Sequence, residues 1–234
     1  MVSLDALFQQ LAAVDPPRAH EALQALREKI WQAGEHPFQR AEAAAALASQ
    51  LSAGHPPLVV GHLCDLLSLV AGAAEVPALK RLLKDAAHAQ AACFALERVQ
   101  CAAAAAALAD ALSEPHTTEL RIAIVNALGR KKDSRFKNRL LDLLRDRQLE
   151  VRLAAADALA HYPAAELYPR FMVVDTDGRE RARRRLADAS LRLAETLLCD
   201  KQRSSAKKIY EVIAKHNDDK PAARAASLAL QELG

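Results

Sequence analysis

The residues that most often perform chemistry are few and scattered in this sequence. Cys64, Cys93, Cys101 and Cys199 lie far apart, form no Cys-x-x-Cys pair and have no histidine or carboxylate partners at zinc-ligand intervals. Nucleophilic catalysis needs a serine or cysteine beside a base that a third group orients, and the sequence has neither a Gly-x-Ser-x-Gly turn nor a glycine-rich phosphate loop. We therefore expect no catalytic residue, no metal site and no cofactor. We also expect reduced, buried thiols in a cytoplasmic protein.

Two short basic stretches are the other candidates for chemistry, because lysine and arginine side chains bind phosphate groups. Lys132 and Arg135 belong to the first stretch. In the second, Arg181, Arg184 and Arg185 would project from one side of a helix, at i, i+3 and i+4. Solvated turns and helix ends also carry such cations, which stabilise exposed carbonyl groups there. Aromatic side chains that could stack on bases are scarce nearby, so nucleic-acid or anion binding is an alternative and not our first interpretation.

The composition favours an all-α fold. The 234 residues include 52 alanines and 36 leucines, the two strongest apolar helix formers. Nine aromatic residues and seven glycines are too few for a series of strands and hairpins. The longest apolar runs are far shorter than the roughly 20 residues that cross a bilayer, so we expect no membrane span.

The charge is unevenly distributed along the chain. The net charge of +3 combines −5 over residues 1–120 with +8 over residues 121–234. This asymmetry favours either an anionic partner for the C-terminal half or a head-to-tail contact between copies of the chain. The sequence does not indicate the oligomeric state.

A repeat is the strongest pattern in the sequence. Residues 88–96, 120–128 and 151–159 align, and each segment ends in Ala-Leu, at intervals of 32 and 31 residues. We interpret each as the second helix of a hairpin, preceded by first helices over residues 76–84, 102–112 and 136–145. A single hairpin cannot bury its own apolar face, so the pattern predicts a stack of like hairpins.

The turns between these helices also follow helix-end chemistry. Gly129 follows the Ala-Leu pair of its repeat and is expected to end that helix in a left-handed conformation. Asp133 or Ser134 is expected to cap the N-terminus of the next helix.

The segments Leu-Leu-Arg-Asp146-x-x-x-Glu-Val-Arg152-x-Ala-Ala-x-Ala-Leu159 and Leu120-Arg121-x-Ala-x-x-x-Ala-Leu-Gly129 resemble HEAT-like repeats of the short bacterial type, which also occur in phycobilisome-lyase-like proteins. The resemblance covers residues 75–160 and implies a right-handed α-solenoid of six or seven stacked hairpins. In that family an Asp that closes the first helix and an Arg that opens the second form a ladder between repeats. The resemblance therefore implies ladder roles for Asp146, Arg152 and Arg121. It also implies a more distant alternative, a lyase-like accessory enzyme.

We expect three regions along the chain. Residues 1–74 are predicted to form degenerate helical hairpins and an N-terminal cap, and residues 75–160 the HEAT-like repeats. Residues 161–234 combine an irregular joint over 161–178 with C-terminal helices over 191–198, 206–215 and 222–233. The stretch around Tyr210 resembles half of a tetratricopeptide repeat.

One surface follows from the repeat register. Phe94, Asn126 and Asp157 occupy the same position on successive second helices, which usually line the concave side of such stacks. Phe94 would suit the core equally well. We expect a non-catalytic protein-binding scaffold or adaptor, whose groove binds another protein or a peptide segment.

Overall fold

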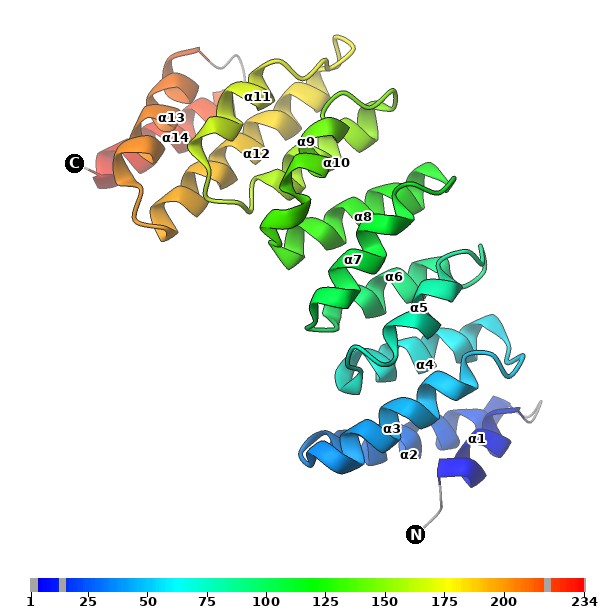
Figure 1. The fold of residues 1–234 in the computed structure, drawn as a ribbon. Coiled ribbons are helices and arrows are strands. Elements are labelled where there is room, and N and C mark those ends of the chain that lie inside the picture. Colours follow the sequence, from blue (N-terminus) through cyan, green and yellow to red (C-terminus); the bar gives the residue numbers. More distant parts are fainter. Residues whose placement is uncertain (1–3, 13–15, 217–219, 234) are drawn as a thin grey trace. The chain divides into compact units, whose positions relative to one another are not determined.

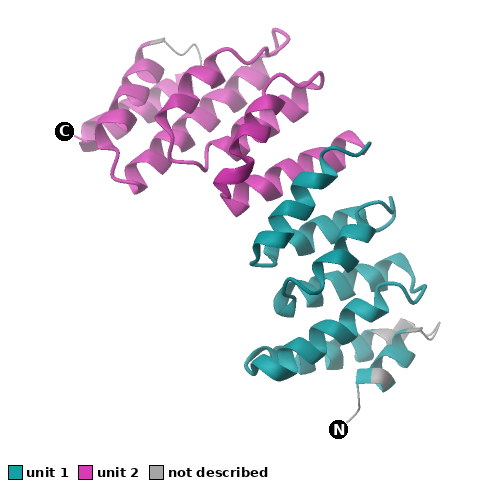
Figure 2. Cartoon of the chain, in the orientation of Figure 1, with its two compact units in different colours: residues 1–115 teal, residues 116–234 magenta. Residues whose placement is uncertain are grey.

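The computed structural model describes residues 4–12, 16–216 and 220–233, which form fourteen α-helices and two short 3-10 helices with no β-strand (Figure 1). The predicted all-α class is therefore confirmed. None of the described helices is both long enough and apolar enough to cross a membrane. The chain divides into two compact units, residues 1–115 and residues 116–234 (Figure 2).

The N-terminal unit is a stack of helical hairpins. Its helices are α1 (Leu4–Ala12), α2 (Pro16–Gly34), α3 (Pro37–Gln50), α4 (Pro57–Val70), α5 (Val76–Leu82), α6 (Ala89–Arg98) and α7 (Ala102–Ala111). Each of α1, α3 and α5 packs on the helix that follows it, and α4 also contacts both α2 and α6. The second helices of successive hairpins thus form one continuous layer, as expected of a solenoid.

The C-terminal unit has the same layered arrangement. Its α-helices are α8 (Thr118–Lys131), α9 (Lys137–Leu143), α10 (Leu149–Leu159), α11 (Tyr168–Met172), α12 (Glu180–Cys199), α13 (Arg203–His216) and α14 (Lys220–Leu233). Within this unit α10 packs against both α8 and α12, and α12 packs against α14. The even-numbered helices therefore form one layer here as well.

The predicted repeat helices are present, within a few residues of their predicted ends. The second helices are α6, α8 and α10, and the first helices are α5, α7 and α9. Leu96, Leu128 and Leu159, which end the Ala-Leu pairs, are all buried. The alanines that precede them are buried too, and their small side chains let neighbouring helices approach closely. The α-solenoid class expected from the repeats is confirmed, and the right-handed sense of its superhelix stays a prediction.

Gly129 has a different role from the predicted one. It lies inside α8 and is buried, and the left-handed residue is Lys132, with φ of 52°, just after the helix ends. A Cβ atom on Gly129 would lie 2.6 Å from Cα and Cβ of Ala158 on α10. The glycine is therefore required by the close approach of α8 to α10 and not by a turn. Asp133 caps the next helical turn as expected, accepting a hydrogen bond from the Arg135 amide at 3.1 Å.

The C-terminal region is more helical than the sequence indicated. Helix α12 begins at Glu180 and not near Leu191, because Ala182, Leu186 and Ala187 form a buried stripe between exposed arginines. Within the predicted joint, a 3-10 turn (Ala165–Leu167) and α11 interrupt the irregular backbone.

The boundary between the two compact units, at residues 115 and 116, falls inside the predicted repeat block of residues 75–160. The three predicted regions were distinguished by the type of repeat and not by compactness, so that division stays a prediction.

The cysteines are all free, but not all are buried. Cys64 and Cys93 are buried as expected, whereas Cys101 is half-buried and Cys199 is exposed. Burial in the apolar interior, with a smaller effect of the neighbouring Asp65 charge, raises the pKa of the Cys64 thiol to about 12. Cys64 therefore stays protonated and unreactive at neutral pH.

Candidate partner-binding surface

Asn126 and Asp157 lie on consecutive second helices of the C-terminal unit, α8 and α10. Both side chains are half-buried, next to the fully buried Ala127 and Ala158. Asn126 forms no side-chain hydrogen bond with any described residue. Two of the three residues predicted to line the groove, Asn126 and Asp157, are therefore partly accessible to solvent.

Asp157, which was predicted to line the groove, forms an ion pair with Arg185, which was predicted to bind anions. Its Oδ2 accepts a hydrogen bond from Nε of Arg185 at 2.7 Å, and its Oδ1 lies 3.4 Å from Nη1 of Arg192. Arg185 reaches a second carboxylate on α10, with its Nη1 at 3.4 Å from Oε2 of Glu150. We call Glu150, Asp157, Arg185 and Arg192 the α10–α12 charge cluster. It contains two carboxylates and two guanidinium groups, so its formal charges cancel.

The surface becomes more positive beyond the C-terminal end of α10. His161 lies just after that helix, and its pKa is lowered by burial and then by the charges of Arg192, Lys132 and Arg130, against a smaller opposing effect of Asp157. The imidazole is therefore held neutral at pH 7. Lys132 is thus one of the cations close to His161.

The other predicted anion-binding residues are divided between paired and unpaired cations. Arg184 pairs with Glu180 one turn earlier on α12, at 2.5 Å. Arg135 pairs with Asp133, also at 2.5 Å, and its hydrogen bonds lower the pKa of the Asp133 carboxyl despite some burial. Arg181 is exposed and has no carboxylate partner among the described residues. Three of the five predicted cations, counting Arg185, are thus already neutralised by carboxylates.

Phe94 is a surface residue and not part of the core. It lies on α6 in the N-terminal unit, is 45% exposed, and has the guanidinium of Arg98 5.5 Å from its ring centroid. With Leu58 and His62 it lines a shallow hollow of about 440 Å³. Because Phe94 belongs to the other compact unit, its place in one groove with Asn126 and Asp157 stays a prediction.

The ladder residues link successive repeats in the C-terminal unit. Arg121 at the start of α8 pairs with Asp146 after α9, with Nη2 and Oδ2 2.5 Å apart. Burial alone would raise the pKa of the Asp146 carboxyl, but hydrogen bonds from Arg121 and the Gln148 amide outweigh it, so the pKa is lowered. The carboxylate thus remains charged and paired at neutral pH.

Arg152 continues this ladder to a residue that the sequence analysis missed. It is buried, donates to the backbone carbonyls of Asp146 and Asp175 at 2.9 Å, and pairs with Oδ1 of Asp177 at 2.7 Å. Arg152 reaches the carbonyl of Asp146 but not its carboxylate, which pairs with Arg121. A signal was present in the sequence, because Arg152 precedes Asp177 by the same 25 residues that separate Arg121 from Asp146.

Lysines replace this ladder in the N-terminal unit. Lys80 pairs with Asp110 at 2.7 Å and Lys84 with Glu114 at 3.0 Å, joining the α5 and α7 segments. These pairs are more exposed than those of Arg121 and Arg152, so we expect them to contribute less to stability.

The described residues contain no cluster of three or more histidine, cysteine or carboxylate side chains that could hold a metal ion. The fold defines the class of protein, an all-α repeat solenoid. The family model described as HEAT repeats matches residues 75–160, which confirms the HEAT-like repeats predicted over the same segment. No curated protein matches the chain.

Several solved structures are similar to the chain at low identity. The complex of CpcE and CpcF of phycocyanin lyase from Nostoc sp. has a TM-score of 0.47 and 20% identity, covering 100% of this chain and 96% of the other. Human deoxyhypusine hydroxylase in complex with glycerol has a TM-score of 0.38 and 16% identity, with coverage of 98% and 95%. An engineered protein has a TM-score of 0.32 and 18% identity, with coverage of 100% and 97%. At these values the similarities carry no argument about function, and the accessory-enzyme alternative stays a hypothesis.

Proposed function

We propose that this protein is a non-catalytic scaffold or adaptor in the cytoplasm, which binds a segment of another protein along α8, α10 and α12. The observation that supports this most directly is the position of Asn126 and Asp157 on two closely packed helices. At Gly129 the two helices approach so closely that a Cβ atom would clash with Ala158, so the two polar side chains stand on tightly packed backbones. A preorganised surface of this kind binds with little loss of conformational entropy.

The charges along this surface suggest the chemistry of the partner. The α10–α12 charge cluster is balanced, which favours a polar segment that exchanges hydrogen bonds with Asp157 and Arg185. Lys132, which is not part of this cluster, makes the end near His161 more positive. We therefore propose that acidic side chains of the partner face that end, where they gain from charge complementarity.

Affinity capture with paired variants tests this proposal. Asn126→Arg places a long side chain on the surface without removing any hydrogen bond among the described residues, and the double variant Asn126→Ala, Asp157→Ala removes the two predicted contacts. Asn138→Arg and the double variant Asn138→Ala, Asp142→Ala are matched controls, because both control residues are exposed on α9, in the other helix layer.

We expect quantitative mass spectrometry to find a protein that is captured by the wild type and by both controls. Its capture should fall at least about tenfold with either surface variant, as for residues at the centre of an interface. Recovery of the same partner by Asn126→Arg, with a melting temperature equal to that of the wild type, would refute the proposed surface.

Nucleic-acid binding is the second candidate, and the exposed, carboxylate-free Arg181 favours it. The pairing of Arg135, Arg184 and Arg185 with carboxylates counts against it. If it is correct, the chain binds duplex DNA with an affinity that falls steeply with salt, and Arg181→Glu lowers this affinity. Absence of binding to duplex DNA at about 50 mM salt would exclude this function.

A further inference from the structure

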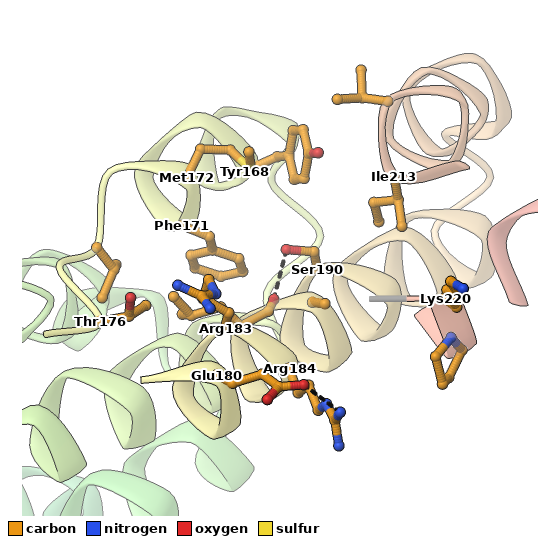
Figure 3. A pocket seen from close by; sticks show the side chains of 15 residues that line it. Tyr168, Phe171, Met172, Thr176, Glu180, Arg183, Arg184, Ser190, Ile213 and Lys220 are labelled. Carbon is orange, nitrogen blue, oxygen red and sulfur yellow. Dashed lines mark hydrogen bonds and ion pairs between the residues drawn. The ribbon is translucent and has the colours of Figure 1, made fainter. Parts of the chain in front are cut away.

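The C-terminal unit contains a second feature that the proposed scaffold function does not use, a cavity of about 650 Å³. Its walls come from α11, α12, α13 and the first residues of α14, as the side chains in Figure 3 show. This volume lies within the range of roughly 300 to 1,000 Å³ that is typical of small-molecule sites. The residues of the α10–α12 charge cluster do not line it.

The walls of this cavity are mainly apolar. Phe171 and Ile213 are buried and form part of its interior, whereas Val212 and Met172 are partly exposed, at 37% and 61%. Exposed apolar side chains beside an open cavity leave hydrophobic surface in contact with water, which is unfavourable. A ligand with an apolar body would remove this surface from water.

Polar groups stand at the edge of the same cavity, and they are predominantly cationic. Glu180 is the lining carboxylate, and it is neutralised by Arg184 at 2.5 Å. Arg183 donates only to the Gly178 carbonyl, at a long 3.4 Å, and has no carboxylate partner among the described residues. Lys220 likewise has no described carboxylate partner, and the two cations lie on different sides of the cavity in Figure 3.

Hydroxyl groups complete the lining. The Ser190 hydroxyl already donates to the Leu186 carbonyl at 2.8 Å. The Tyr168 hydroxyl forms no hydrogen bond with any described residue, and burial raises its pKa, so it remains a protonated donor. The cavity therefore combines apolar walls with two cations that have no carboxylate partner among the described residues, and with the hydroxyls of Tyr168 and Thr176, neither of which is hydrogen-bonded to a described residue.

We propose that this cavity binds a small amphipathic carboxylate, with its apolar body against Phe171 and Ile213 and its carboxylate at Arg183 or Lys220. Charge complementarity selects an anion over a cation or a neutral molecule of the same size, because each cation gains a partner that the described residues do not supply. The proposal is independent of the partner-binding surface on α8, α10 and α12.

Calorimetric titration of the whole protein with dodecanoate, below its micelle concentration, tests this inference. We expect saturable binding of one molecule per chain. Dodecylammonium and dodecan-1-ol, which have the same apolar body, should bind at least about tenfold more weakly, since neither pairs with a cation. Absence of saturable binding by dodecanoate, or equal binding of dodecanoate and dodecylammonium, would overturn the proposal.

Variants locate the binding site. Arg183→Gln should weaken dodecanoate binding several-fold, and the double variant Arg183→Gln, Lys220→Gln should weaken it further. Val212→Trp fills the cavity from its exposed side and should abolish binding with little change in melting temperature. Arg181→Gln is the matched control, because Arg181 lies on the same helix but does not line the cavity. If the double variant Arg183→Gln, Lys220→Gln binds dodecanoate as well as Arg181→Gln does, the assignment is wrong.

Discussion

The close contact between α8 and α10 predicts how the protein responds to the substitution Gly129→Ala. In most helix interiors this change stabilises, because alanine is favoured over glycine by roughly 0.5–1 kcal/mol. Here the added methyl group would lie 2.6 Å from both Cα and Cβ of Ala158, and 3.2 Å from its carbonyl carbon. Two of these three atoms are backbone atoms, so the clash cannot be relieved by a change of side-chain rotamer.

The magnitude follows from these two opposing effects. Overpacking of a dense core typically costs about 1–3 kcal/mol, and a backbone clash places this site near the upper end. After subtraction of the gain in helix propensity, we expect Gly129→Ala to lower the free energy of unfolding by about 2 kcal/mol. The two helices would also have to move apart, which would disturb the spacing of Asn126 and Asp157.

Gly61 provides a control of opposite sign. It lies within α4, and a Cβ atom there would have no neighbour within 4 Å. Gly61→Ala should therefore raise the stability of the N-terminal unit by up to about 1 kcal/mol. Urea unfolding followed by circular dichroism measures both effects, and hydrogen exchange in α8 and α10 separates the two units, which need not unfold together. If Gly129→Ala stabilises the protein as Gly61→Ala does, the close packing of α8 on α10 is wrong.

Three further predictions concern stability. Leu128→Ala should cost about 2–5 kcal/mol in urea unfolding, as for other buried leucines, and a cost below about 1 kcal/mol would contradict the repeat register. Arg152→Met should cost about 2–4 kcal/mol because it removes the hydrogen bonds of a buried guanidinium to part-buried carbonyls together with its ion pair to Asp177. Lys84→Met, at an exposed ion pair, should cost less than about 1 kcal/mol, and equal costs would contradict the difference in burial. The third concerns pH. The folded-state pKa of Asp146 lies below its ordinary value of 3.8, so its pairing with Arg121 stabilises the fold above that pH and this contribution is lost as the pH falls through the folded-state pKa. The stability difference between the wild type and Arg121→Gln should therefore shrink between pH 7 and about pH 3, and a constant difference would refute the pairing.

The repeat helices could be predicted from the sequence because their signals are local. The Ala-Leu pairs mark buried positions, and Leu96, Leu128 and Leu159 are all buried in the structure. The start of helix α12 was harder to delimit, because exposed arginines dominate its first turns, although buried and exposed positions alternate there with a clear helical period. The role of Gly129 could not be inferred from local sequence, because the atoms that require a glycine belong to Ala158 on another helix.

The candidate site could be predicted only in part, for the same physical reason. Register placed Asn126 and Asp157 on successive second helices, and the structure places them on α8 and α10. The pairing of Asp157 with Arg185 depends on how α12 is rotated against α10, which tertiary packing determines. Asp177 could have been predicted as the partner of Arg152 from the 25-residue spacing between them. It was missed because it lies in a segment with no helical periodicity.

Site-specific photo-crosslinking tests most directly whether the second-helix face of the C-terminal unit contacts a protein. A benzophenone side chain is introduced at Asn126 on α8 or, for comparison, at Asn138 on α9, and the covalent products formed in cells are identified. We predict one predominant protein attached at position 126 and little or none of it at position 138. Equal attachment at both positions, or attachment at position 138 alone, would contradict the account.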